Sequence, residues 1–123
     1  MAKISVSIDV SDMEKGVLFY SKALGCNKDR VGTDISELSA DNATIYLLNK
    51  ESGSNPLLND TASRNYDRHW TPVHLDFSVP DIEQAVSLVQ EFGGSKEGFE
   101  SGDWGSIAFC ADPFGHGFCL VKT

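Results

Sequence analysis

Two short segments of the sequence carry polar side chains with ligand-binding or catalytic chemistry at every second position. They are Ser5, Ser7 and Asp9 in the first segment, and His74, Asp76 and Ser78 in the second. Alternate residues of a strand point to the same face, so each segment would have one polar and one apolar face. Because an unpaired buried polar group costs about 1–3 kcal/mol, the polar faces indicate a wet cleft and not a core.

The apolar positions of the same segments are expected to pack against helices. Those positions are Ile4, Val6, Ile8 and Val10 in the first segment, and Val73, Leu75, Phe77 and Val79 in the second. A helix signal follows each segment. Asp12 would cap a helix with an apolar stripe at Met13, Val17, Tyr20 and Leu24 that ends at Gly25. Asp81 would cap a second helix that ends at Gly93-Gly94.

The same order of elements occurs twice along the chain. The two capping residues are 69 residues apart, and so are the closing residues Gly25 and Gly94. Further strands are predicted near 30–33, 35–40, 43–49, 96–100, 105–111 and 117–122. The chain therefore reads as one α+β domain, 1–123, built from βαβββ units at about 1–50 and 72–123. The linker loop 51–71 between them is polar, and loops of this length are usually functional or mobile.

These features resemble the vicinal oxygen chelate superfamily, which includes glyoxalase I, bleomycin-resistance proteins and extradiol dioxygenases. The resemblance rests on residues 8–12, 19–25, 73–77 and 112–116, in that order, and covers nearly the whole chain outside the linker. It implies that each βαβββ unit curls its sheet into half of a barrel-like cleft, with helices on the outer face. Two halves, from one chain or swapped between two, would enclose a ligand.

The resemblance also implies four positions at which enzymes of this superfamily hold a divalent metal ion. The family pattern is His or Gln on the first strand of each unit and Glu on the last; this chain has Ser5, Tyr46, His74 and Cys119 there. Serine is a poor donor, and tyrosine ionises only near pH 10. Asp76 could turn in as a third ligand beside His74 and Cys119, but it lies two residues, about 6–7 Å, along the strand from His74. Two ligands rarely retain an ion, so no metal and no other cofactor is expected.

Other chemistry remains open at the same residues. His74 and Cys119 would form a nucleophile–base pair if the imidazole activated the thiol. The simpler expectation is an inert buried thiol beside a hydrogen-bonded histidine, since no oxyanion-hole motif is visible. His116 lies in a turn and His69 in the linker, and neither is expected to be a metal ligand.

The expected cleft has an acidic character that bears on its ligand. Asp9 lies where metal-using relatives carry a cation, and with Asp76 and a net charge of −8 it indicates a cationic or hydrogen-bond-donating ligand. The alternative is that Asp9 is simply solvated at the end of its strand. Flat contact area would come from Tyr46 inside the cleft and from aromatic residues near its rim. The rim candidates are Trp70, Tyr66, Trp104 and Phe114.

Composition narrows the class of protein. A chain of 123 residues with 41% hydrophobic and 23% charged residues is typical of a soluble globular protein. No segment approaches the roughly 20 apolar residues that span a bilayer, so no membrane partner is expected. The excess of 18 acidic over 10 basic residues argues against a nucleic-acid partner. Three cysteines without a CxxC pair favour free thiols in the cytoplasm.

The profile is most similar in general features to the bleomycin-resistance branch, whose members act as ligand-sequestering dimers. The expected function is therefore small-molecule binding by a cytoplasmic homodimer that lacks the usual metal ligands. A metal-dependent isomerase, lyase or dioxygenase with an altered ligand set remains the alternative, so whether the chain is an enzyme stays open. A pure interaction module with a filled cleft is the third reading.

Overall fold

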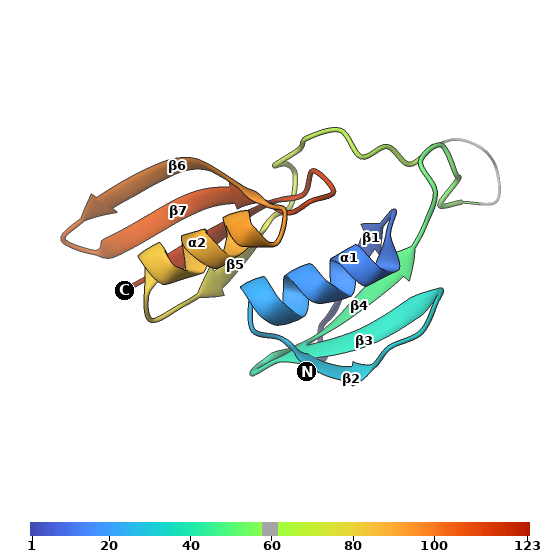
Figure 1. Ribbon diagram of the computed structural model, residues 1–123, viewed down its shortest axis with the longest axis horizontal. Helices are drawn as coiled ribbons and strands as arrows, with labels where there is room; N and C mark the ends of the chain where they lie inside the picture. Colours follow the sequence, from blue (N-terminus) through green and yellow to red (C-terminus); the bar gives the residue numbers. More distant parts are fainter. Residues whose placement is uncertain (58–61) are drawn as a thin grey trace.

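The structure, a computed structural model, describes residues 1–57 and 62–123, and its elements follow one another in two similar series (Figure 1). The first series is β1 (Ser5–Val10), α1 (Met13–Leu18), the π-helical turn η1 (Phe19–Ala23), β2 (Asn27–Arg30), β3 (Ile35–Ala40) and β4 (Ala43–Asn49). The second is β5 (Leu75–Ser78), α2 (Ile82–Glu91), β6 (Ser95–Gly102), β7 (Gly105–Ala111) and β8 (Gly117–Lys122). The repeated βαβββ order is confirmed. Residues 58–61 of the predicted linker loop lie outside the described residues.

Each series forms its own four-stranded mixed sheet, and the two sheets have the same topology. The strand orders are β1-β4-β3-β2 and β5-β8-β7-β6. The first strand of each unit pairs in parallel with the last, and the remaining pairs are antiparallel. β1 and β5 therefore lie at the edges of their sheets. Figure 1 shows α1 lying over the first sheet and α2 over the second, which fits the predicted α+β class.

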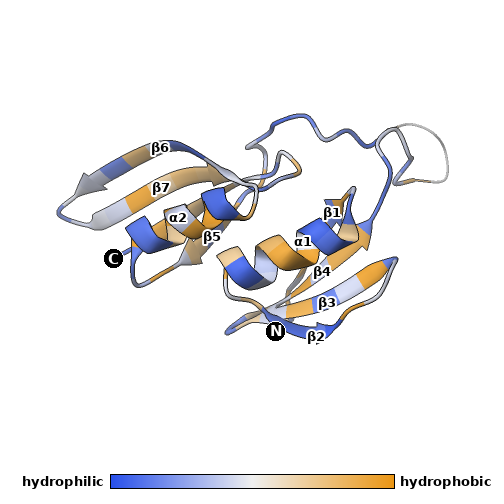
Figure 2. Ribbon diagram, viewed as in Figure 1, coloured by the Kyte–Doolittle hydropathy of each residue, from blue (hydrophilic) through white to orange (hydrophobic). Residues whose placement is uncertain are grey.

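The core forms where the apolar faces of the sheets meet the helices (Figure 2). Leu38, Leu47 and Val10 are fully buried in the first unit, and Leu120 and Val89 in the second. Phe19 of η1 is also fully buried, and its ring packs edge-on against Phe118 of β8 with centroids 6.1 Å apart. This contact joins the hydrophobic cores of the two units into one cluster.

Both helices begin where the sequence predicts. The Asp12 carboxylate accepts a hydrogen bond from the Lys15 backbone N–H at 3.1 Å, and Asp81 accepts one from Gln84 at 3.1 Å. The first helix, predicted as one stripe to Leu24, is α-helical only to Leu18 and continues as the π-helical turn η1. A π turn inserts an extra residue, so it rotates the side chains that follow relative to an α-helix.

Two strand predictions are wrong at their ends. The strand expected at 30–33 lies at Asn27–Arg30, because Gly32 instead turns back and donates its N–H to the Ser36 hydroxyl at 3.2 Å. The strand expected from Val73 starts at Leu75, because the Gly117 N–H that would extend the ladder is donated to the His69 carbonyl at 2.9 Å. Val73 is consequently 75% exposed and does not pack against a helix.

The start of the first strand shows the same effect on a smaller scale. The β1–β4 ladder begins with Ser5 opposite Thr44, so Ile4 precedes the sheet and is 81% exposed.

Within the part of the chain that the structure describes, no helix has the length and apolar character needed to cross a membrane. The cysteines Cys26, Cys110 and Cys119 are all free thiols and all buried.

Candidate functional site

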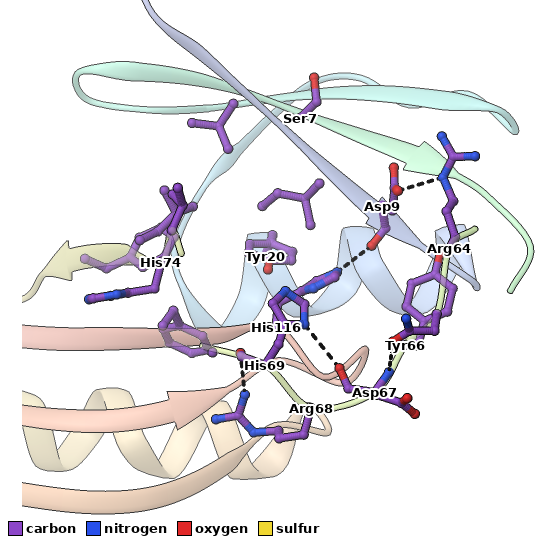
Figure 3. Close-up of a pocket in the computed structure, with 18 of the residues that line it drawn as sticks. Ser7, Asp9, Tyr20, Arg64, Tyr66, Asp67, Arg68, His69, His74 and His116 are labelled. Atoms are coloured by element: carbon purple, nitrogen blue, oxygen red, sulfur yellow. Dashed lines mark hydrogen bonds and ion pairs between the residues drawn. The ribbon is translucent and has the colours of Figure 1, made fainter. Parts of the chain in front are cut away.

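A cavity of about 560 Å³ lies between the two βαβββ units, and we call it the interunit cavity (Figure 3). Four stretches supply its wall: residues 6–9 of β1, linker residues 63–69, residues 73–75 with Phe77 at β5, and residues 116–118 at the start of β8. Tyr20 of η1 completes it. The cavity thus forms where the edge strands β1 and β5 face the linker.

The wall of the interunit cavity combines apolar side chains from the strands with polar side chains from the strands and the linker. Ile8, Leu75 and Phe118 are among its apolar members, and the partly buried Val6 and Phe77 extend the same surface. The linker and the turn before β8 contribute charged and imidazole groups instead. An apolar pocket with a few convergent polar groups is the usual form of a small-molecule site.

The linker is fastened to the first unit by two polar contacts. The Arg64 Nε donates to the Asp9 Oδ2 at 2.8 Å, and the ion pair is only partly exposed. The Tyr66 hydroxyl donates to the Lys50 carbonyl at 2.7 Å, and burial followed by the nearby Asp9 charge raises the pKa of Tyr66. Arg64 therefore offsets the negative charge of Asp9 inside the cavity.

Two histidines meet at the polar side of the cavity. The His116 Nε2 lies 2.7 Å from the Asp9 carbonyl oxygen, and the His69 Nδ1 lies 3.1 Å from the Asp67 carbonyl oxygen. A carbonyl oxygen only accepts, so each of these ring nitrogens carries a proton and donates it. In the neutral form, the His116 Nδ1 and the His69 Nε2 remain as acceptors. The two rings pack edge to face with centroids 5.1 Å apart.

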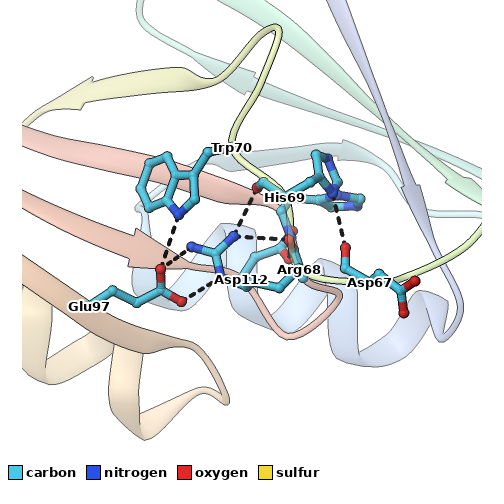
Figure 4. A network of polar contacts seen from close by, with 8 residues as sticks. Asp67, Arg68, His69, Trp70, Glu97 and Asp112 are labelled. Carbon is cyan, nitrogen blue, oxygen red and sulfur yellow. Dashed lines mark hydrogen bonds and ion pairs between the residues drawn. The ribbon is translucent and has the colours of Figure 1, made fainter.

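A separate network pins the linker to the second unit (Figure 4). Arg68 makes a two-point ion pair with Glu97 of β6 and also donates to the His69 carbonyl at 2.8 Å. The Trp70 Nε1 donates to the same Glu97 carboxylate at 3.0 Å, and the guanidinium lies 4.8 Å from the centre of the Trp70 ring. The hydrogen bonds from Arg68 are the main cause that lowers the pKa of Glu97. The network fixes the position of His69.

Tyr20 contributes a buried contact between the units. Its hydroxyl donates to the Asp112 Oδ2 at 2.6 Å, while the Asp112 Oδ1 accepts from the backbone N–H groups of Phe114 at 2.8 Å and His116 at 2.9 Å. Burial, followed by the adjacent Asp112, raises the pKa of Tyr20 well above its ordinary value. Tyr20 is therefore a neutral donor that holds the turn carrying His116.

Three further side chains converge on the sheet of the second unit, and we call them the His74–Asp76–Cys119 trio. One ligand atom from each lies within 4.8 Å of the others, and the His74 Nε2 is 3.3 Å from the Asp76 Oδ1. The His74 and Asp76 side chains are 40% and 58% exposed, whereas Cys119 is 1% exposed. Burial, followed by the Asp76 charge, raises the pKa of Cys119 to about 11.

The raised pKa of Cys119 bears on the alternative in which His74 activates Cys119 as a nucleophile. The Cys119 thiol is protonated at neutral pH because burial and the Asp76 charge raise its pKa, and the His74 Nε2 also faces Asp76. A thiolate is the reactive form of cysteine, and nothing in this arrangement generates one. The geometry therefore does not favour nucleophilic catalysis by Cys119.

The structure divides the site residues predicted from sequence into three places. Ser7, Asp9 and His74 line the interunit cavity. Asp76 and Cys119 face each other across the β5–β8 ladder next to His74. Three predicted residues, Ser5, Tyr46 and Trp104, are not among the described residues that line the interunit cavity. Trp104 lies in the hairpin between β6 and β7, is 54% exposed and would contact any side chain at Gly102.

Several residues that line the cavity were not predicted as site residues, among them Tyr20, Arg64, His69 and His116, whereas Tyr66 was predicted at the rim. A signal for Arg64 and His69 lies in the linker, where charged and aromatic residues are concentrated at positions 64–70. Periodicity does not detect such a segment, because it belongs to no helix or strand. Tyr20 was assigned to the core stripe of a helix, and η1 turns it toward Asp112.

The family described as "Glyoxalase-like domain" matches residues 5–121. The chain belongs to this family. The assignment places this glyoxalase-like protein in the vicinal oxygen chelate superfamily, as the sequence motifs predict. No curated protein matches its sequence.

Solved structures share the fold at low sequence identity. The fosfomycin resistance protein FosX from Listeria monocytogenes is 12% identical, with 100% of this chain and 93% of FosX covered and a TM-score of 0.75. A glyoxalase-related enzyme from Fulvimarina pelagi is 15% identical, with coverages of 100% and 89% and a TM-score of 0.74. A glyoxalase/bleomycin resistance protein from Albidiferax ferrireducens T118 is 19% identical, with coverages of 97% and 96% and a TM-score of 0.69. At these identities, the likeness shows the fold alone.

The metal positions of the superfamily do not fit a metal ion in this glyoxalase-like protein. Ser5 and Tyr46 lie on β1 and β4 of the first sheet and offer only hydroxyl groups, which are poor donors to a divalent ion. His74 and Cys119 lie with the second sheet and have Asp76 between them. The donors that do converge therefore all belong to the second unit.

Proposed function

We propose that this glyoxalase-like protein binds a small molecule in the interunit cavity. The observation that carries the proposal is the composition of the wall, which brings apolar side chains of β1, β5 and β8 together with the imidazole rings of His69 and His116. The volume of about 560 Å³ falls within the range of ligand pockets. The matching ligand has an apolar body and a head group that donates hydrogen bonds.

The charge distribution favours a neutral donor over a cation. Arg64 already pairs with Asp9 at 2.8 Å, so the carboxylate has little uncompensated charge for an ammonium group. Within residues 1–57 and 62–123, the hydrogen bonds given for His69 and His116 use one ring nitrogen each, which leaves the other nitrogen to accept from a ligand. A hydroxyl or amide N–H of the ligand would donate a hydrogen bond to one of these ring nitrogens. The sequence predicts either a cationic or a hydrogen-bond-donating ligand. This proposal retains the hydrogen-bond donor.

Sequestration of that ligand by a cytoplasmic homodimer belongs to the same proposal. The edge strands β1 and β5 leave one side of each sheet unpaired, and the exposed Ile4 beside β1 adds an apolar contact for a second copy of the chain. The three unpaired buried thiols suit a reducing compartment. Light scattering at micromolar concentration should give the mass of a dimer, and a monomer would contradict this part of the proposal.

Ligand binding is tested by fluorescence with three probes of similar size. The background is Trp104→Phe, which leaves Trp70 as the one tryptophan, 5.7 Å from the His74 ring. Benzyl alcohol should change the Trp70 emission at lower concentration than toluene, which lacks the donor. Benzylamine should bind no more tightly than benzyl alcohol, because Arg64 offsets Asp9.

Matched variants decide whether the histidines recognise the donor. His69→Ala and His116→Ala should each abolish the preference for benzyl alcohol over toluene. Tyr46→Phe, which removes a hydroxyl outside the interunit cavity, should retain it. The proposal fails if none of the probes changes the emission, or if the preference survives in both histidine variants.

A second candidate function, a metal-dependent isomerase, lyase or dioxygenase with an altered ligand set, is favoured by one observation. The trio brings a nitrogen, an oxygen and a sulfur donor together beside the interunit cavity, with His74 common to both. A metal held there would polarise a bound carbonyl or activate water. Whether the trio binds a metal is a separate question from ligand binding.

A further inference from the structure

We propose that His74, Asp76 and Cys119 form a zinc-type divalent-metal site contained entirely within the second βαβββ unit. The proposal goes beyond small-molecule binding in the interunit cavity, which requires no metal. It also differs from the metal pattern of the superfamily, which draws ligands from both units and has no ligand at the position of Asp76. The first unit, with Ser5 and Tyr46, contributes nothing to the proposed site.

The spacing of the donors fits a tetrahedral ion. Zinc–nitrogen and zinc–oxygen bonds of about 2.0–2.2 Å at a tetrahedral angle place the two donor atoms about 3.3–3.5 Å apart. The observed distance between the His74 Nε2 and the Asp76 Oδ1 is 3.3 Å. Cys119 Sγ lies within 4.8 Å of both, against about 3.5–3.7 Å in a tetrahedral site. The two exposed side chains have room to close that difference.

The backbone explains why these donors converge despite their spacing along the strand. Asp76 of β5 lies directly opposite Cys119 of β8 in the parallel ladder, so their side chains share one face of the sheet. His74 precedes β5 at the point where the ladder is interrupted by the bond from the Gly117 N–H to the His69 carbonyl. The His74 ring reaches Asp76, and the Trp70 ring packs edge-on against the His74 ring with centroids 5.7 Å apart.

The chemistry of the trio selects the class of ion. One imidazole nitrogen, one carboxylate oxygen and one cysteine sulfur, which releases its proton to solvent when the ion binds, match the ligands that zinc takes, and three protein ligands leave a fourth position for water or substrate. Calcium and magnesium prefer all-oxygen sites and are excluded by the nitrogen and sulfur donors. The exposed His74 and Asp76 provide the path of entry, while the buried Cys119 keeps the third ligand away from bulk water.

The test uses cobalt and zinc on the full chain prepared free of metal. Cobalt should bind at one equivalent with a sulfur-to-cobalt charge-transfer band and visible bands of a four-coordinate site, and zinc should displace it. Cys119→Ser should remove the charge-transfer band. Loss of a supporting residue around a metal typically weakens binding about 10–100-fold, so removal of the ligand in Asp76→Asn should weaken it by at least about tenfold.

Matched controls separate this site from the alternatives. Cys110→Ser removes a thiol that is equally buried and also has a pKa raised to about 11, but which lies in the core cluster on the other face of the sheet. That variant should keep the cobalt spectrum. Ser5→Ala with Tyr46→Phe should also keep it, whereas loss of binding in that variant would mean a site shared between units.

The outcomes decide the proposal even if a variant folds poorly. His74→Gln and Asp76→Asn change exposed side chains, so both should keep the circular dichroism spectrum of the parent and still lose cobalt affinity. Cobalt binding without a sulfur band, or unchanged affinity in both variants, would overturn the metal site. The fluorescence response to benzyl alcohol in metal-free protein is read separately, so failure of one proposal leaves the other measurable.

Discussion

β1 and β5 occupy equivalent places in the two units: each lies at the edge of its sheet, pairs in parallel with the last strand of its unit and precedes a helix capped by aspartate. Their chemistry differs. The polar face of β1 has hydroxyls and an aspartate neutralised by Arg64, whereas β5 and β8 gather an imidazole, a carboxylate and a thiol. Repetition of the backbone therefore fixes where functional groups can lie, and the individual side chains decide which unit carries them.

Truncation of an equivalent core leucine should lower the free energy of unfolding by a similar amount in each unit, because the two cores are built alike. Leu47 pairs with Ile8 in the first sheet, Leu120 pairs with Phe77 in the second, and both leucines are fully buried. Leu47→Ala and Leu120→Ala should each lower the free energy of unfolding by about 2–5 kcal/mol. Chemical denaturation followed by circular dichroism measures the loss.

The shape of the same unfolding curves tests whether the units depend on each other. Phe19 packs against Phe118 in one shared cluster, so each leucine variant should unfold in a single transition that shifts as a whole. Two transitions, of which the substitution moves only one, would show that the units unfold independently.

The Tyr20–Asp112 contact between the units should contribute more to the free energy of unfolding than the Tyr66–Lys50 contact that holds the linker to the first unit. Tyr20→Phe leaves the buried Asp112 Oδ2 without its donor, so it should cost about 1–3 kcal/mol of unfolding free energy. Tyr66→Phe removes a partly exposed hydrogen bond to Lys50, and its expected cost is about 0.5–1.5 kcal/mol. Equal losses in the two variants would mean that the Tyr20–Asp112 contact has no special role in joining the units.

The fold was largely readable from sequence because its signals are local. Alternation located β1, and the aspartate caps and closing glycines located both helices within a few residues. The errors have distant causes. β5 is shorter than its pattern because Gly117 bonds to His69 of the linker, and Tyr20, buried in the core as predicted, also bonds to Asp112 of the second unit. Contacts between segments far apart in sequence leave no periodic trace.

The site was readable only in part for the same reason. Ser7, Asp9 and His74 line the cavity, but the alternate residues Val6, Ile8 and Leu75 line it as well, so strand alternation did not separate a cavity side from a helix side. Arg64 and His69 belong to the linker, whose position is set by its bonds to Asp9 and Glu97 and not by a pattern of its own. The separation of His74 from Asp76 was estimated for an unbroken strand, and the interrupted ladder makes their side chains meet at 3.3 Å.

The smallest expected effect comes from the network that pins the linker to the second unit. Arg68 lowers the pKa of Glu97 in the folded protein, so this pair contributes stability above the ordinary glutamate pKa of 4.5 and loses it as the pH falls toward the lowered value. Glu97 is about one third exposed, which limits the contribution to about 1 kcal/mol or less. Glu97→Gln should therefore destabilise the protein slightly at pH 7 and not at pH 3, as measured by thermal melting at low salt.

Glu100→Gln on the same strand is the matched control and should melt like the parent at pH 7. If the two variants behaved alike at both values, the Arg68–Glu97 pair would not hold the linker, and the position of His69 in the cavity wall would depend on its backbone contacts with residues 115 and 117 instead.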